Sequence, residues 1–202
     1  MRAAAVVLAA GRSSRMGSNK LLLPFDGKTV LETTLDALRG IDTVVVTGHK
    51  PEELGGVLSK YKAKVVHNPR YEEGMTTSFQ AGLMAVDADA AFLVLGDQVG
   101  LSRGMLSTMV QVMVDDEDAQ IVSPRYGERR GHPVLFRLSL FGEILSLGPG
   151  ESLRDVVARH EDGHRYVEGD AWTVIDIDTP EEYEAARKLW SLMGRARPPP
   201  SP

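Results

Sequence analysis

Glycine, hydroxyl and positively charged residues crowd into one loop that directly follows an apolar stretch. Residues 3–9 read AAAVVLA, and residues 11–20 read GRSSRMGSNK. Glycines let backbone N–H groups turn toward an anion, and Arg15 and Lys20 can add positive charge to phosphate oxygens. The loop therefore predicts a phosphate-binding site, with a glycine-rich turn carrying solvated charges as the alternative.

Two widespread phosphate-binding patterns do not match this loop. The Walker pattern needs a glycine, four further residues and then Gly-Lys, whereas here two residues separate Gly17 from Lys20. The dinucleotide pattern GxGxxG is absent from the loop, which argues against NAD and FAD. The prediction is a phosphate ligand of another kind.

Strand-like and helix-like segments alternate along the chain. Apolar runs predict strands at residues 3–9, 42–48, 63–67, 90–97, 119–124, 132–136, 164–167 and 172–177. Helical spacing of apolar residues predicts helices at 29–40, 51–61, 79–86, 102–113, 138–147, 153–160 and from Pro180 onward. This alternation predicts an α/β fold with a mostly parallel sheet covered by helices on both sides, whose ligands bind at the carboxyl ends of the strands.

Composition narrows the class of protein. Hydrophobic residues make up 43% and charged residues 25% of the 202 residues, as in ordinary soluble globular proteins. The net charge of -5 argues against a nucleic-acid partner. The absence of cysteine excludes disulfides and thiolate sites and fits the cytoplasm. The apolar run near the N-terminus is too short to span a bilayer, so we expect a cytoplasmic protein without a membrane partner.

Two further features concern domain organisation and histidine spacing. Residues 1–194 contain no linker or repeat and predict a single domain, whereas RARPPPSP at 195–202 predicts a disordered tail. His160 and His164 have a spacing that zinc sites use, but no third ligand lies nearby in the sequence. We interpret both histidines as surface residues.

Several motifs together resemble a known family. LAAGRSSRMGSNK resembles the signature of nucleotidyltransferases that activate sugars, isoprenoid precursors and molybdopterin. NPRYEEGMTTSFQAGL, VLGDQ, RGHPVLF and DIDTPEEY make the chain similar, over nearly its whole length, to the molybdenum cofactor cytidylyltransferase group. The resemblance implies a three-layer α/β/α Rossmann-like nucleotidyltransferase fold with a mostly parallel mixed sheet. It also implies transfer of CMP from CTP to molybdenum-loaded molybdopterin, with release of pyrophosphate.

Carboxylates at strand ends suit such a reaction, because Mg²⁺ binds one or two carboxylates together with phosphates and water. Asp97 follows the predicted strand FLVLG, and Asp178 follows TVIDI. The resemblance implies that both coordinate Mg²⁺, while a role in capping helices or turns is the alternative. Asp176 shares the side-chain direction of Asp178 only if the strand continues through both residues.

The resemblance also implies the remaining site residues. Arg15, Lys20 and Asp97 are implied as catalytic. The implied nucleotide-binding residues are Leu8, Ala9, Ala10, Gly11, Arg12, Ser13, Ser14, Arg15, Met16, Gly17, Lys20, Asn68, Gly74, Met75 and Ser78. Acceptor binding falls to the turn RYGERRGH, which carries Arg125 and Arg129 and contains the implied contacts Arg130, Gly131 and His132. A polar loop with Ser78 inside the following helix is the alternative for the base-binding segment.

One position departs from the family pattern. Val99 stands where the group usually has a proline, so we expect the loop after Asp97 to be looser or differently bent. Ala10 stands where guanylyl-transferring relatives have a glycine, which favours CTP over GTP.

Alternative functions are a guanylyltransferase, a sugar- or alcohol-phosphate nucleotidyltransferase, and a non-catalytic chaperone that delivers molybdopterin to a client molybdoenzyme.

Overall fold

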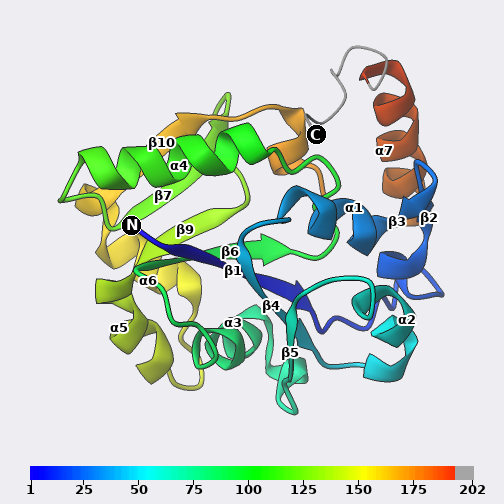
Figure 1. The fold of residues 1–202 in the computed structure, drawn as a ribbon, viewed down its shortest axis with the longest axis horizontal. Helices are drawn as coiled ribbons and strands as arrows, with labels where there is room; N and C mark the ends of the chain where they lie inside the picture. Colours follow the sequence, from blue (N-terminus) through cyan, green and yellow to red (C-terminus); the bar gives the residue numbers. More distant parts are fainter. Residues whose placement is uncertain (194–202) are drawn as a thin grey trace.

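A mixed eight-stranded sheet runs through the centre of the computed structural model, which describes residues 1–193 (Figure 1). The strand order is β10-β7-β9-β6-β1-β4-β5, and β8 pairs with β7. The strands are β1 (Ala3–Ala9), β4 (Asp42–Thr47), β5 (Lys64–His67), β6 (Ala90–Leu95), β7 (Ile121–Tyr126), β8 (Arg129–Arg130), β9 (Val134–Arg137) and β10 (His164–Glu168). A separate hairpin joins β2 (Pro24–Phe25) to β3 (Lys28–Thr29).

Two kinds of pairing divide this sheet. β5, β4, β1 and β6 pair with one another in parallel, and so do β10 and β7. β9 is antiparallel to both β6 and β7. The prediction of a mostly parallel mixed sheet is therefore confirmed.

Helices cover both faces and complete the three layers (Figure 1). One hydrophobic cluster joins the sheet to α1 (Val30–Ala37), α2 (Gly55–Leu58), α4 (Arg103–Asp115) and α7 (Pro180–Met193). A second cluster joins the opposite face to α3 (Met75–Leu83), α5 (Phe141–Ser146) and α6 (Leu153–Arg159). Short 3-10 helices lie at Lys20–Leu22, Pro51–Leu54, Tyr71–Glu73, Leu138–Leu140, Glu161–Gly163 and Ala171–Val174.

β1 shows how the apolar runs build this core. Ala5 and Val7 belong to the first cluster and Val6 to the second, because successive side chains of a strand point to opposite faces. All three are fully buried. The strand therefore needs apolar residues at every position, which is why its sequence does not alternate with polar residues.

α1 forms largely as its sequence predicts. The Thr29 hydroxyl accepts from the backbone N–H of Glu32, and the Glu32 carboxylate accepts in return from the backbone N–H of Thr29. The side chains predicted to share one face are buried, namely Val30, Leu31, Leu35 and Leu38. This helix packs beside the 3-10 helix Lys20–Leu22 and so supports the end of the phosphate-binding loop.

Three predicted elements differ from the structure. Residues 172–177 form no strand: the Asp170 carboxylate accepts from the N–H of Trp172 and starts the 3-10 helix Ala171–Val174. The predicted helix 51–61 becomes a 3-10 turn and the one-turn α2, where Gly55 and Gly56 weaken helix formation. α3 ends at Leu83, before Val86.

Two predictions concern the C-terminal end of the chain. The tail predicted at 195–202 lies outside the described residues, and the single domain over 1–194 stays a prediction. Within residues 1–193, every helix is too short or too polar to cross a bilayer.

Candidate nucleotide-binding site

A cavity of about 640 Å³ opens where β1 and β6 end. β4 and β5 lie on one side of β1 and β6 lies on the other, so the strand order reverses here, and parallel sheets bind ligands at the carboxyl ends of strands at such a point. The predicted site residues that line the cavity are Leu8, Ala9, Ala10, Gly11, Ser13, Lys20, Gly74, Met75, Ser78, Asp97, Arg130, Gly131, His132 and Asp178. Segments distant in the sequence therefore meet at one site, and Asp176 lines it as well.

Lys20 lies at the centre of the charged contacts. Its Nζ donates to Asp97 Oδ2 at 2.5 Å and to Asp178 Oδ1 at 2.7 Å. Burial lowers the pKa of Lys20, but the negative charges of Asp97 and Asp178 more than offset this, so the pKa lies above its usual value. Lys20 is therefore charged at neutral pH and is shared by two carboxylates.

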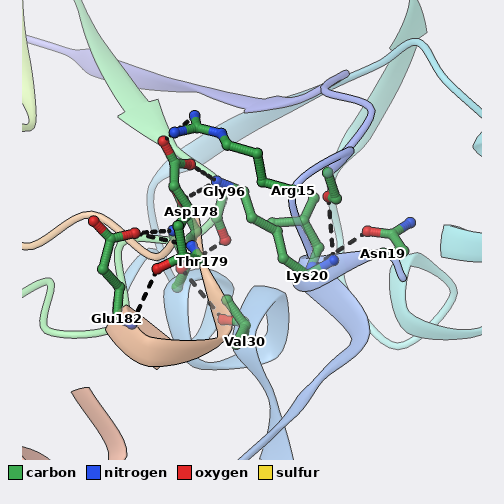
Figure 2. A network of polar contacts seen from close by, with 12 residues as sticks. Arg15, Asn19, Lys20, Val30, Gly96, Asp178, Thr179 and Glu182 are labelled. Atoms are coloured by element: carbon green, nitrogen blue, oxygen red, sulfur yellow. Dashed lines mark hydrogen bonds and ion pairs between the residues drawn. The ribbon is translucent and has the colours of Figure 1, made fainter. Parts of the chain in front are cut away.

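Asp178 connects Lys20 to the phosphate-binding loop (Figure 2). Arg15 Nη2 donates to Asp178 Oδ2 at 2.6 Å. The hydrogen bond from Lys20 is the main reason that the pKa of Asp178 lies below its usual value. Arg15 comes from the loop after β1, so this carboxylate holds two cations of the phosphate-binding loop.

The start of α7 positions Asp178, although no strand forms there. The backbone N–H groups of Asp178 and Thr179 both donate to Glu182 Oε2 at 2.9 Å (Figure 2). The Glu182 N–H donates back to the Thr179 hydroxyl at 3.2 Å. These contacts resemble a capping box and fix the backbone just before Pro180.

Asp176 adds a third carboxylate to the same wall. Burial raises its pKa first, and the nearby negative charges of Asp97 and Asp178 raise it further. This wall therefore carries more negative charge than Lys20 alone neutralises. Among residues 1–193 no three His, Asp, Glu or Cys side chains converge as a complete metal site, so a bound ion would take its other ligands from phosphate and water.

The loop 11–19 is shaped by local contacts. Ser13 has φ 50° and Gly17 has φ 68°, and the Ser13 hydroxyl accepts from the N–H of Lys20 at 3.2 Å. Arg12 forms an ion pair with Glu72 and lies 5.8 Å from the Tyr71 ring centroid. The predicted residues that do not line the cavity are Arg12, Ser14, Arg15, Met16, Gly17 and Asn68.

A buried amide organises the segment predicted to contact the base. Asn68 Nδ2 donates to Thr77 Oγ1 at 3.1 Å and to Ser78 Oγ at 3.0 Å, and Asn68 Oδ1 accepts from the N–H of Arg70 at 2.9 Å. Ser78 lies inside α3, as the alternative interpretation held, and it also lines the cavity. Gly74 precedes α3 with φ 111°, a conformation that favours glycine.

The hairpin predicted to contact the acceptor forms another wall. Arg130 makes a two-pronged ion pair with Glu161, at 3.1 Å and 2.8 Å, and Arg129 donates to the carbonyl of Val174 at 2.9 Å. Arg125 pairs with Glu128 and is not among the residues that line the cavity. Arg129 thus lines the cavity together with Arg130, although only Arg130 was expected there, and acceptor binding by this turn stays a prediction.

His132 is held tightly at the end of this hairpin. Its N–H donates to the carbonyl of Thr173 at 2.8 Å, and its own carbonyl accepts from Gln98 Nε2. Burial lowers the pKa of His132, and the negative charges of Asp176 and Asp97 only partly oppose this. The ring is therefore neutral at pH 7.

The loop after Asp97 is well packed, so it is not looser, which was one of the two outcomes expected from Val99; a different bend stays a prediction. Val99 is buried, and the N–H groups of Gln98 and Leu101 donate to Leu95 and Gln98 carbonyls, at 3.1 Å and 3.3 Å. An apolar side chain pointing into the core fixes this turn without a proline. The loop is bent and ordered by hydrogen bonds, not loosened.

Some lining residues were missed from the sequence. These are Leu21, Tyr71, Leu95, Arg154, Thr173 and Val174. Tyr71 stands in the motif NPRYEEG and could have been inferred as an aromatic beside the base segment. Arg154 lies on α6, a helix far along the chain, and carries no local signal of this position.

The interpretation of His164 as a surface residue is wrong. This side chain is buried on β10, where Nε2 lies 2.8 Å from the Ser123 hydroxyl. Burial lowers its pKa to about 4. His160 is half-buried and contacts Gln120 and Glu143 at 2.7 Å and 2.6 Å. Both histidines therefore serve packing and hydrogen bonding between elements.

Curated relatives of known name cover nearly the whole chain. The Escherichia coli molybdenum cofactor cytidylyltransferase is 28% identical over 92% of this chain and 96% of its own length. A probable molybdenum cofactor guanylyltransferase from Methanosarcina acetivorans is 30% identical over 95% of this chain and 92% of its own length.

Solved structures agree with these relatives. A nucleotidyl transferase from Methanothermobacter superposes with a TM-score of 0.81 at 29% identity, over 95% of this chain and 99% of that one. The Mycobacterium tuberculosis protein Rv0371c, solved in complex with manganese, gives a TM-score of 0.75 at 28% identity, over 93% and 99% of the two chains. The profile of the MobA-like NTP transferase domain matches residues 5–166. This chain therefore belongs to the MobA-like NTP transferase family and is a nucleotidyltransferase.

Proposed function

We propose that the protein transfers CMP from CTP to molybdenum-loaded molybdopterin and releases pyrophosphate. The observation that carries this proposal is the contact of Lys20 with Asp97 and Asp178 inside the cavity that the phosphate-binding loop borders. The similarity to the Escherichia coli cytidylyltransferase supports the choice of reaction.

The proposed reaction needs little covalent participation by the protein. An oxygen of the acceptor phosphate attacks the α-phosphorus of the nucleotide, the bond to the β-phosphate oxygen breaks, and pyrophosphate leaves. The acceptor phosphate is already ionised at neutral pH, so no protein base is needed. Lys20 and Arg15 would hold the triphosphate, because catalysis among anionic groups depends on positioning and on charge neutralisation.

The acidic wall fits a divalent ion. Asp97 and Asp178 already share the ammonium group of Lys20, and burial together with these two carboxylates raises the pKa of Asp176, which supports a surplus of negative charge at this wall. Asp97 and Asp178 would hold Mg²⁺, with Asp176 beside them. Bound there, the ion would neutralise charge on the phosphate oxygens. The manganese complex of Rv0371c supports a divalent ion in this family.

Base selectivity is the part of the proposal with a named rival. Ala10 and Ser78 line the cavity, and Ala10 favours CTP because guanylyl-transferring relatives have a glycine at this position. The similarity to a probable guanylyltransferase makes GTP the second candidate. Pyrophosphate release with each of the four nucleoside triphosphates and molybdopterin distinguishes them: we expect release with CTP, and release with GTP alone would reverse the assignment.

Product identification tests the whole reaction. After incubation with CTP, Mg²⁺ and molybdopterin, mass spectrometry should find the cytosine dinucleotide form of the cofactor. Asp97→Ala should abolish turnover with the fold intact, as checked by circular dichroism. Full turnover by this variant at saturating metal would contradict the role of Asp97. A sugar or alcohol phosphate as the better acceptor would change the substrate but retain the reaction.

The non-catalytic alternative differs in one measurement. A chaperone that delivers molybdopterin to a client molybdoenzyme would bind nucleotide tightly without releasing pyrophosphate. The ordered loop around Val99 gives this alternative no structural support. We place the enzyme in the cytoplasm, with no nucleic-acid or membrane partner, and a client molybdoenzyme as the acceptor of its product.

A further inference from the structure

Two buried polar atoms at the cavity wall have no hydrogen-bond partner. They are Oε1 of Gln98 and Nδ1 of His132. Within residues 1–193 these are the buried side-chain nitrogen and oxygen atoms that lack a partner. A buried polar atom without a partner loses its hydrogen bonds to water and destabilises the fold, so two such atoms at one place require an explanation.

The same two residues are already joined. Gln98 Nε2 donates to the backbone carbonyl of His132, which brings the amide group beside the histidine. The N–H of His132 is held by Thr173, so the histidine backbone is fixed on both sides. Gln98 is 5% exposed and does not line the cavity, whereas His132 does. Gln98 is therefore a buried neighbour of His132 that does not itself line the cavity.

The chemistry of the two atoms determines how they can pair. Oε1 of Gln98 can only accept a hydrogen bond. A neutral imidazole carries its proton on one nitrogen, and burial lowers the pKa of His132, which keeps the ring neutral. Because the Gln98 amide is bonded to the His132 backbone, a proton on Nδ1 would offer Oε1 a nearby donor, whereas a proton on Nε2 would leave both Nδ1 and Oε1 as acceptors without a donor. The Nδ1–H tautomer is the one that satisfies both residues.

The other ring nitrogen then faces the ligand. Nε2 of His132 has no hydrogen bond to residues 1–193 and is absent from the buried atoms without a partner, so it is accessible from the cavity. In the Nδ1–H tautomer this nitrogen is a hydrogen-bond acceptor. It matches a ring N–H or an amino group and does not match a phosphate oxygen, which also needs a donor.

We infer that Gln98 is a positioning residue that fixes His132 in the Nδ1–H tautomer, so that Nε2 accepts a hydrogen bond from an N–H donor on the heterocycle of the acceptor substrate. This inference rests on the proposed function for the identity of the acceptor. In this proposal His132 recognises the heterocycle of the acceptor, whereas Lys20 and the arginines bind the phosphates. The site would therefore discriminate against acceptors without an N–H donor at that edge.

Nuclear magnetic resonance tests the tautomer without any turnover. In ¹⁵N-labelled protein, long-range ¹H–¹⁵N correlation of the imidazole rings, with His132 assigned from the H132Q variant, should show a protonated Nδ1 and an unprotonated Nε2. In Q98M the preference for Nδ1–H should be lost. A proton on Nε2 in the unsubstituted protein would overturn the inference, whatever reaction the enzyme performs.

Steady-state kinetics test the consequence for the acceptor. With molybdopterin as acceptor and CTP as donor, Q98M should raise KM for molybdopterin about tenfold, as loss of an outer positioning contact does elsewhere, with KM for CTP unchanged. The matched control is Q111M, because the Gln111 side chain is exposed on the surface of α4, where it contacts Asp115. An equal rise in both KM values would indicate general disorder and contradict the inference.

Discussion

At the scale of single residues, Lys20 is held by the two carboxylates that we propose as ligands of Mg²⁺. The Lys20 side chain is 18% exposed and that of Asp97 12% exposed, so their contact is screened less than a surface ion pair. Removing one member of such a group leaves an unpaired charge, which costs about 3–5 kcal/mol when it is fully buried. Lys20 thus contributes to stability, in addition to the phosphate binding that we propose for it.

K20M should reveal the carboxylates as a cation site. We expect kcat/KM to fall at least about 100-fold, because a charge aimed at the transition state is lost. We also expect a lower Tm in EDTA and a larger rise of Tm with added MgCl₂ than in the unsubstituted protein, because the ion replaces the missing positive charge.

The control for this prediction is K60M. Lys60 pairs with Glu32 at 2.8 Å, but its side chain is 62% exposed and does not line the cavity. Its loss should change Tm little and leave the response to MgCl₂ unaltered. An equal Mg²⁺ response in K20M and the unsubstituted protein would contradict a cation site at Asp97 and Asp178.

At the scale of elements, the cavity wall that we expect to contact the acceptor depends on the close approach of two elements. These are β8, with the residues that follow it, and the 3-10 helix Ala171–Val174. A Cβ atom built on Gly131 would lie 2.3 Å from the carbonyl oxygen of Thr173. No side chain fits in that space without moving backbone. The same approach holds the N–H of His132 against Thr173.

Gly131→Ala should therefore separate these two elements. We expect a loss of about 1–3 kcal/mol in the free energy of unfolding and a raised KM for the acceptor, measured by urea denaturation and steady-state kinetics. Gly142→Ala is the control, because open space surrounds that position on α5 and alanine favours a helix. If G131A were as stable as G142A and had an unchanged KM, the close approach would not matter for the site.

The elements also differ in how well the sequence alone predicts them. β1, β4, β6 and α1 were predictable, because long apolar runs and a capping box are local signals. Residues 172–177 were not, because TVIDI has strand composition while a cap from Asp170 and the packing of Trp172 against Gly100 decide its form. Asp178 was found by its motif, yet its position depends on Glu182, through contacts formed only in the folded chain.

Across the whole molecule, the sheet joins a parallel half to a mixed half, and His164 lies in the second. This side chain is buried between Ser123 and Tyr166, at 2.8 Å and 3.1 Å from its ring nitrogens. Burial holds its pKa at about 4, against 6.5 for an ordinary histidine. The folded protein therefore resists protonation of a group that the unfolded chain protonates readily.

Global stability should depend on pH through His164. Above pH 6.5 the residue is neutral in both states and its contribution is complete; as the pH falls from 6.5 toward 4, the unfolded chain binds the proton first and stability is lost. The expected loss is about 3 kcal/mol. Urea denaturation at several pH values should show a flatter profile for H164Q.

His67 supplies the comparison for this pH profile. It is exposed on the edge strand β5, so H67Q should leave the profile unchanged. Carboxylates contribute to acid unfolding in every variant, which is why the difference between variants is the quantity to compare. Identical profiles for H164Q and the unsubstituted protein would contradict the assigned burial effect.

The ion pairs of Lys20 also bear on which small anions of the cell compete for the enzyme. A lysine already matched by Asp97 and Asp178 offers little net attraction to sulfate or free phosphate, which would meet these carboxylates as well. A nucleotide that is already bound to a cation has its negative charge neutralised, so the two carboxylates do not repel it in this way. The resting enzyme should thus remain available to its substrate in the presence of simple salts, and millimolar sulfate should inhibit it only weakly.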